Sequence, residues 1–520
     1  MNDNYSLVIE ANNIFDGHTF LPTKGYLCIK ENKLVDVGLG SAPESAKSNA
    51  EKVICFDKEL VMPGIVDVHT FFAGYAVFHV GADLTNVASV EECEAVVEKF
   101  LKEKNPAGVI LGHGWKPKLL EEAAATEMIE SKFCEKPVIL FASDRSTCIM
   151  NEIAKKEYGF TPETCYPESY YRIMREYLND REFIEGEFKD YMKMLNVKGV
   201  TTVKEMGFDD FYGFTDYLKE IEDSDTLHLR TFFMSQPVGE KINLPYAKKM
   251  RELFTGDKIR FGGFNLMTDG TIAAYKGDLK EPYEDKDFTC KLEVPYDEIE
   301  KDVLAADAEG FRYSLHAQGD RAVAKVADIY EKCQMENGKL KNRHALTDLE
   351  FSDVEDIERL GRIGATAELY FQIMSLDPGD EVKDNILRTI GSERGKNYWN
   401  RRRMKDAGMN LSGATDLPLV ITDVAEAVYH SCGGFLSGGE QFQPENTISI
   451  PEILEAWTYG GQKNIGMEEK LGTIEKGKLA DIAVFDRNFN DIDTKYAKEI
   501  KVVMTIMDGR IVYDETDKMK

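Results

Sequence analysis

The stretch Val61-Met62-Pro63-Gly64-Ile65-Val66-Asp67-Val68-His69-Thr70-Phe71-Phe72 decides the fold of this chain. Its Pro-Gly turn leads into a short, apolar, β-branched run, which predicts a strand buried on both faces, as in a parallel sheet. In barrels built from such strands, functional side chains lie where the strands end, and His69 stands at that position. Side chains alternate along a strand, so residues 69 and 71 share one direction. A second histidine there would chelate a metal ion, but the phenyl ring of Phe71 offers no lone pair.

The stretch is similar to the signature Pro-Gly-hydrophobic-hydrophobic-Asp-x-His-x-His that opens the barrel of amidohydrolase superfamily enzymes, apart from Phe71. Two later segments extend the resemblance to amidohydrolase family 3, whose members resemble N-substituted formamide deformylases. Residues 312–321 are similar to the family's His-Ala-x-Gly-Asp motif, and residues 409–418 to its Gly-Ser-Asp-x-Pro segment on the last barrel strand. The resemblance covers nearly the whole chain and implies a (β/α)₈ TIM barrel.

The domain organisation follows from the distribution of predicted strands. Both ends of the chain are rich in short apolar runs, while strands alternate with helices in the middle. Each end alone has too few strands to bury a sheet face. We therefore predict a small β-sandwich built from residues 1–60 and 470–520, an arrangement that the resemblance also implies. Residues 61–469 then form the catalytic barrel, with a helical insertion at 153–198.

The composition excludes several kinds of partner. The chain carries 92 acidic residues against 64 Lys and Arg, a net charge of −28, which argues against nucleic acid or an anionic membrane as a partner. No apolar span approaches ~20 residues, so no transmembrane helix is expected. The first residues lack the features of a signal peptide. Nine scattered cysteines without a Cys-x-x-Cys pair indicate a reduced protein. We expect a cytoplasmic homodimer that binds a small-molecule substrate.

The predicted metal ligands are His69, His316 and Asp416. Imidazole nitrogens and carboxylate oxygens suit zinc, iron or manganese, so these residues are expected to hold one divalent metal ion or none. The resemblance places the family's bridging lysine at Asn265 and a further histidine ligand at Asp348. Asn265, Asp348 and Phe71 all stand where the family has a different, metal-binding residue. A binuclear centre is therefore not expected.

The predicted catalytic residues are Asp416, Asp348 and His316. The resemblance implies that Asp416 accepts a proton from the attacking water and returns it to the leaving group. Without a metal ion, Asp348 and Asp416 could form an acid–base pair, and His316 could serve as a second proton carrier. Alternatively, Asp416 only caps the helix that follows it.

The predicted substrate-binding residues are Phe71, Arg145, Asn265 and Tyr275. The leading functional hypothesis is a divergent hydrolase that cleaves a C–N, amide-like bond of a small molecule. Two alternatives stay open at this stage. One is a metal-independent lyase or isomerase that uses the Asp and His residues directly, and the other is a catalytically silent small-molecule-binding protein on the same scaffold.

Overall fold

A computed structural model gives the fold of the chain, which forms two compact units. The structure describes residues 5–104, 106, 108–143, 147–165, 169, 172–209, 213–237 and 240–516. The larger unit contains residues 1–70, 192–207 and 221–520. The smaller unit contains residues 71–191 and 208–220.

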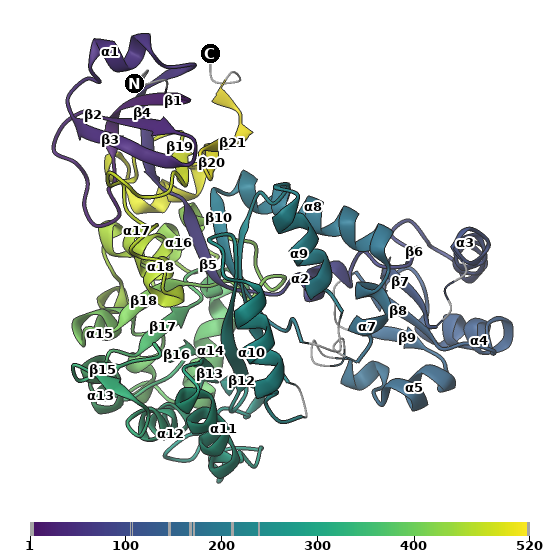
Figure 1. Cartoon of the computed structure of the whole chain (residues 1–520). Helices are drawn as coiled ribbons and strands as arrows, with labels where there is room; N and C mark the ends of the chain where they lie inside the picture. Colours follow the sequence, from purple (N-terminus) through teal and green to yellow (C-terminus); the bar gives the residue numbers. More distant parts are fainter. Residues whose placement is uncertain are drawn as a thin grey trace. The chain divides into compact units, whose positions relative to one another are not determined.

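An eight-stranded parallel sheet in the larger unit curls into a nearly closed (β/α)₈ barrel, which confirms the predicted fold class (Figure 1). In sheet order the strands are β18 (Asn410–Gly413), β17 (Thr366–Leu369), β16 (Ala345–Asp348), β13 (Arg312–Ala317), β12 (Ile259–Met267), β11 (Arg230–Ser235), β10 (Val200–Glu205) and β5 (Ile65–Thr70). The first strand meets the segment that follows the last strand, where the Asp416 N–H donates to the carbonyl of His69 in β5 at 2.9 Å. The barrel therefore closes at residues that the sequence analysis singles out.

Helices follow the barrel strands and cover their outer face. They are α10 (Leu244–Leu253), α11 (Tyr296–Ala308), α12 (Asp320–Tyr330), α13 (Val354–Ile363), α14 (Gly379–Thr389), α15 (Arg401–Asp406), α16 (Val424–Ser431), α17 (Ile450–Trp457) and α18 (Tyr459–Ile465), with the short strands β14 (Met335–Glu336) and β15 (Lys339–Leu340) after α12. Helix α12 shows the pattern: Val323, Val326 and Tyr330 recur at helical spacing and are buried. The Tyr330 hydroxyl donates to the carbonyl of Ala345 at 2.6 Å, which ties the helix to the barrel wall.

Strands from both ends of the chain form one seven-stranded sheet, drawn in purple and yellow in Figure 1. Its order is β21 (Arg510–Asp514), β20 (Val502–Met507), β19 (Ile482–Phe485), β4 (Val53–Pro63), β1 (Leu7–Ile14), β2 (Gly25–Lys30) and β3 (Lys33–Leu39), and helix α1 (Glu44–Ser48) precedes β4. Strand β4 joins the two ends, because it pairs in parallel with β1 and antiparallel with β19. Arg230 of β11 forms ion pairs at 2.8 Å with Asp481 and Asp508, which hold this sheet against the barrel.

The smaller unit has its own four-stranded sheet. Its strands are β6 (Ala82–Asp83), β7 (Ile110–Trp115), β8 (Val138–Ala142) and β9 (Cys148–Met150). The helices of this part of the chain are α2 (Phe72–Ala76), α3 (Val90–Glu103), α4 (Glu122–Lys132), α5 (Glu152–Tyr158), α7 (Met174–Leu178), α8 (Arg181–Val197) and α9 (Thr215–Asp223). Trp115 is fully buried in the core and donates to the Leu140 carbonyl at 2.8 Å. Strands and helices alternate here as they do in the barrel, so the sequence pattern alone does not separate the two sheets.

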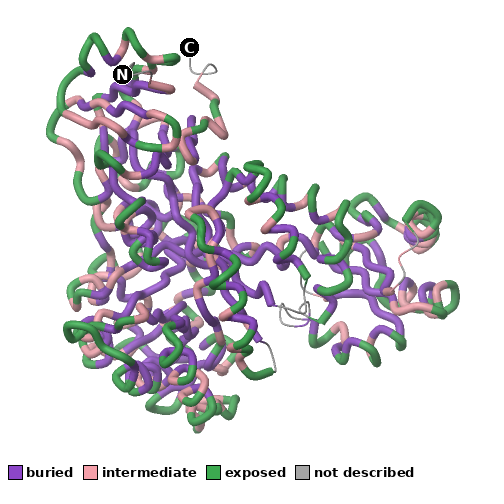
Figure 2. Tube along the Cα trace, viewed as in Figure 1, coloured by how far each residue is buried: buried purple, intermediate pink, exposed green. Residues whose placement is uncertain are grey.

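Most residues of the barrel strands are buried, as the purple tube in Figure 2 shows. Every residue of β5, β10 and β13 is buried, including charged residues such as Asp67 and Lys204. This agrees with a strand covered on both faces, by the helices outside and by the barrel interior.

None of the helices in the described part of the chain combines the length and the apolar run that a membrane crossing needs.

The pairing of the two chain ends leads to a first prediction. Deleting residues 486–520 removes β20 and β21, exposes the edge of β19 and uncovers apolar side chains such as Ile482. An unpaired apolar edge promotes aggregation. We expect the truncated protein to be insoluble on expression, measured by the soluble fraction after centrifugation. Tyr496→Ala, at a side chain that is 50% exposed, is the matched control and should stay soluble. A soluble, monodisperse truncation would contradict the role of these strands.

Candidate active site

Side chains from separate barrel strands gather at the C-terminal end of the barrel. They are His69 of β5, Asn265 of β12, His316 of β13, Asp348 of β16 and Asp416 after β18. The rings of His69 and His316 lie edge to face with their centroids 4.7 Å apart. His69 Nε2 is 3.5 Å from Asp416 Oδ1. All predicted metal-ligating and catalytic residues therefore lie together.

A hydrogen-bond chain holds His316 from both sides. His316 Nδ1 lies 3.1 Å from Asp348 Oδ2, which also accepts from Gln318 Nε2 at 3.2 Å. Asn265 Nδ2 lies 3.2 Å from His316 Nε2 and donates to Gln236 Oε1 at 3.0 Å. With Nδ1–H donating to Asp348, Nε2 accepts from Asn265. Each ring nitrogen of His316 thus has a partner.

The two histidines have opposite electrostatic environments. Burial lowers the pKa of His69 to about 4, so its ring is neutral at neutral pH. Burial acts on His316 in the same direction, but the adjacent carboxylate of Asp348 outweighs it and raises the pKa of His316 above its ordinary value. In turn, His316 lowers the pKa of Asp348 although burial alone would raise it. His316 and Asp348 therefore act as a coupled pair, and Asp348 is ionised.

Asp67, two residues before His69 in β5, fixes the backbone at His69. Its Oδ1 accepts the His69 backbone N–H at 3.1 Å, and its Oδ2 accepts the hydroxyls of Thr415 and Thr422 at 2.6 Å each. Both threonines flank Asp416 in the segment that follows the last barrel strand. Asp67 consequently couples the first strand to the loop that carries Asp416.

A buried ion cluster lies deeper in the barrel, and the sequence analysis did not find it. Lys204 of β10 forms a very short ion pair with Glu368 of β17, and both side chains are fully buried. Arg312 approaches the same carboxylate at 3.8 Å. Burial would raise the pKa of Glu368, but these two cations hold it well below its usual value. Glu368 Oε2 is 4.0 Å from His69 Nδ1, so the charge of the cluster faces the site.

Three buried polar atoms at the site have no hydrogen-bond partner among the described residues. They are the Tyr370 hydroxyl, Asn265 Oδ1 and His69 Nδ1. The Tyr370 ring lies 5.9 Å from the His69 ring. Such groups are uncommon in folded proteins because each costs about 1–3 kcal/mol when it stays unpaired. Tyr370 is absent from the sequence-based set, although its place directly after β17 is a signal that could have identified it.

Backbone strain is concentrated at the strand ends that carry the carboxylates. Asp348 has φ 74°, Leu349 φ 51° and Asp416 φ 53°, all in the left-handed region. A non-glycine residue pays about 1–3 kcal/mol for such a conformation, and it persists where the surrounding structure imposes it. Both aspartates thus lie where the backbone leaves regular strand geometry, Asp348 at the end of β16 and Asp416 after β18.

The remaining predicted substrate-binding residues lie in varied positions. Phe71 is buried and precedes α2 as the first residue of the smaller unit. Tyr275 donates to Asp285 at 2.7 Å, and its ring packs against cations such as Lys286 and Arg388. Arg145 lies outside the described residues. Contact of these side chains with a substrate stays a prediction.

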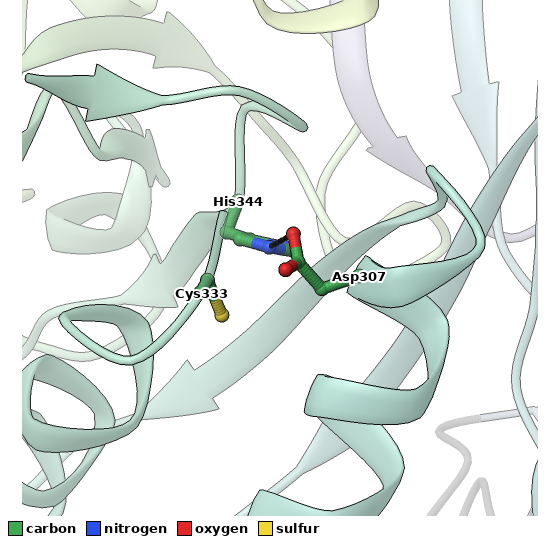
Figure 3. A group of neighbouring side chains, drawn as sticks. All are labelled: Asp307, Cys333 and His344. Carbon is green, nitrogen blue, oxygen red and sulfur yellow. Dashed lines mark hydrogen bonds and ion pairs between the residues drawn. The ribbon is translucent and has the colours of Figure 1, made fainter. Parts of the chain in front are cut away.

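Another group of side chains has the spacing of metal ligands (Figure 3). Among the described residues, Asp307, Cys333 and His344 are the only such group with ligand atoms within 4.8 Å of one another. However, the Tyr313 N–H donates to His344 Nδ1 at 2.9 Å, so Nε2 carries the ring proton and donates to Asp307 at 2.9 Å. Burial raises the pKa of the Cys333 thiol to about 12. With neither a free imidazole lone pair nor a thiolate, this cluster is a structural hydrogen-bond network.

The predicted barrel ligands do not fit a metal site of three protein ligands. His69 Nε2 and Asp416 Oδ1, at 3.5 Å, are close enough to share an ion. No third His, Cys, Asp or Glu ligand atom of the described chain lies within 4.8 Å of both. His316 does not complete the set at this distance, and both of its ring nitrogens have other partners.

Comparisons with known proteins agree with this architecture. The sequence profile of the amidohydrolase family matches residues 58–513. Protein LONG AFTER FAR-RED 3 of Arabidopsis thaliana is 23% identical over 98% of this chain and 91% of its own length. N-substituted formamide deformylase of Arthrobacter pascens is 28% identical over 44% of this chain and 42% of its own. The crystal structure of an uncharacterized metal-dependent hydrolase from Pyrococcus furiosus superposes with a TM-score of 0.71, at 21% identity, over 92% of this chain and 99% of that one.

The buried cluster predicts unequal effects of removing its members. Glu368→Gln leaves the cations of Lys204 and Arg312 buried without a counter-charge, so the free energy of unfolding should fall by about 3–5 kcal/mol. Lys204→Met should cost less, because Glu368 keeps Arg312 at 3.8 Å and the Thr347 hydroxyl at 2.8 Å. Urea unfolding followed by circular dichroism measures both. Glu381→Gln, on the exposed face of α14, should be neutral. Equal losses for the two buried substitutions would refute this account of the cluster.

Proposed function

Because the chain belongs to the amidohydrolase family, we propose that it is a hydrolase that cleaves a C–N, amide-like bond of a small molecule. One observation carries the choice of bond: the site holds a buried, unpaired acceptor and a buried, unpaired hydroxyl beside its histidines and carboxylates. The first is Asn265 Oδ1 and the second is the Tyr370 hydroxyl. Family membership itself supports the broader class of hydrolase.

A secondary amide offers a hydrogen-bond donor for Asn265 Oδ1 and an acceptor for the Tyr370 hydroxyl. Its N–H can donate to Asn265 Oδ1, and its carbonyl oxygen can accept from the Tyr370 hydroxyl. Pairing both atoms removes the cost of leaving them unsatisfied, about 1–3 kcal/mol each. An ester of the same shape has no N–H and would leave Asn265 unpaired. The site therefore favours an amide over an ester.

Asp416 is the proposed general base. Its side chain is 42% exposed, so water reaches it, whereas His69 beside it is buried and neutral. Water attacks the amide carbon while Asp416 takes its proton, and the oxygen of the tetrahedral intermediate accepts a hydrogen bond from Tyr370. Asp416 then returns the proton to the nitrogen as the C–N bond breaks. The products are a carboxylic acid and an amine.

A metal-independent lyase or isomerase is the second candidate. The coupled pair of His316 and Asp348 favours it, because such a pair can move a proton without a hydrolytic water. The two candidates differ in their products: only hydrolysis releases a free amine together with an acid. Release of amine from a panel of secondary amides, including N-substituted formamides, distinguishes them, and N-methylated analogues should react more slowly.

Asp416→Asn tests the proposed base. The substitution keeps the size of the side chain but removes its basicity, so turnover should fall by about 10²–10⁴-fold while substrate binding changes little. Amine release gives the rate, and isothermal titration with a slow substrate gives the affinity. Asp384→Asn, an exposed carboxylate in α14, is the control and should react at the wild-type rate. Turnover of Asp416→Asn within a few-fold of wild type would remove Asp416 from the mechanism. Unfolding of the variant would indicate a structural role for Asp416; it is not the cap of the helix that follows, because the side chain of Asp423 caps α16.

A further inference from the structure

Asn265 and Asp348 contact the two ring nitrogens of His316, and these contacts decide whether His316 can bind a metal ion. We infer that the barrel carries out its chemistry without the metal ion of its family, and that Asn265 and Asp348 hold His316 as a hydrogen-bonding group. The inference deepens the proposed function and rests on it only for the reaction type. Three features of the larger unit support it: the Nδ1 partner, the Nε2 partner, and the spacing of the other two predicted ligands.

Asp348 occupies the Nδ1 side of His316 at 3.1 Å. A carboxylate on one imidazole nitrogen is common for a metal-bound histidine, since it fixes the tautomer with the other nitrogen free. Here Asp348 stands where the resemblance places a histidine ligand, so the site loses that ligand, and the carboxylate contacts His316 Nδ1 instead. Gln318 donates to the same oxygen at 3.2 Å and holds the carboxylate toward His316.

Asn265 occupies the Nε2 side, which is where an ion would have to bind. A zinc–nitrogen bond is about 2.0–2.1 Å long, and the Asn265 amide nitrogen lies 3.2 Å from Nε2 along the hydrogen-bond direction. Gln236 Oε1 accepts from the same amide nitrogen at 3.0 Å, which keeps the N–H side turned to His316. With these hydrogen bonds made, the Nε2 lone pair is directed at the Asn265 amide and Nδ1 at Asp348.

His69 and Asp416 are left as a pair. Their nearest ligand atoms are 3.5 Å apart, and no third ligand atom of the described chain completes the set within 4.8 Å. Phe71 supplies no lone pair. Two monodentate ligands bind a divalent ion weakly compared with the three or four protein ligands of catalytic and structural sites. Polarisation of the substrate carbonyl therefore falls to hydrogen-bond donors, of which Tyr370 is buried and unpaired.

Metal content of the full-length protein tests this inference directly. Wild type and His316→Ala are incubated with excess Zn²⁺, Mn²⁺ or Fe²⁺ under argon, dialysed against metal-free buffer and analysed by mass spectrometry of the elements. We expect both proteins to retain the same amount of each metal. His344→Ala reports any ion held at the cluster of Asp307 and Cys333. About one equivalent in wild type that His316→Ala loses and His344→Ala keeps would overturn the inference.

A variant with a restored ligand provides the positive control. The double variant Asn265→Ala/Asp348→His returns one histidine ligand and frees Nε2 of His316. Its zinc affinity should rise at least about 10-fold over wild type, in the range that changes around metal ligands produce. A folded double variant with wild-type affinity would show that these residues do not exclude the ion. The measurements on wild type stand if the double variant does not fold.

The failure of this inference and the failure of the proposed function are distinguishable. Metal bound through His316 overturns the metal-free site and leaves amide hydrolysis in place. Conversely, absence of amine release from every amide overturns the proposed function and does not alter the metal content. If wild-type protein dialysed against a chelator releases amine at the same rate as untreated protein, the result supports both the metal-free site and the proposed function.

Discussion

The hydrogen-bond chain through His316 is the constraint on which the rest of the site depends. Asn265 and Asp348 come from strands on either side of β13, and each engages one ring nitrogen. Because the strands of a parallel barrel all end at the same rim, residues distant in sequence can form such a chain with little distortion. Gln236 and Gln318 extend it at both ends. The chain leaves Asn265 Oδ1 free for a ligand and withholds His316 from a metal ion.

The charges around this chain are arranged so that each histidine has a distinct role. The carboxylate of Asp348 supports a proton on His316, whereas burial keeps His69 neutral next to Asp416. Deeper in the barrel, Glu368 balances the cations of its cluster and lies 4.0 Å from His69. Burying an ion cluster is costly, and removing one partner from it costs about 3–5 kcal/mol. The carboxylate of Glu368 therefore contributes both to the stability of the barrel and to the surroundings of His69.

The resemblance of local motifs to those of the family was enough to predict the barrel, and a buried apolar run that ends in a polar residue is typical of the rim of a parallel barrel. Pairings between distant segments could not be predicted. Lys204 and Glu368 are 164 positions apart, and only a lysine inside an apolar strand hinted at a buried partner. The sheet of residues 82–150 repeats the alternation of strands and helices seen in the barrel, so periodicity did not set it apart. Likewise, the packing of Tyr275 against surface cations depends on tertiary contacts alone.

Anomalous diffraction tests the central claim most directly. Crystals of the wild-type protein grown with excess Zn²⁺ or Mn²⁺ would be measured at the absorption edge of each metal, which locates every bound ion independently of activity. The account predicts no anomalous peak between His69, His316 and Asp416, with the Asn265 amide still within hydrogen-bond distance of His316 Nε2. A strong peak within about 2.3 Å of His316 Nε2, with Asn265 displaced, would contradict it.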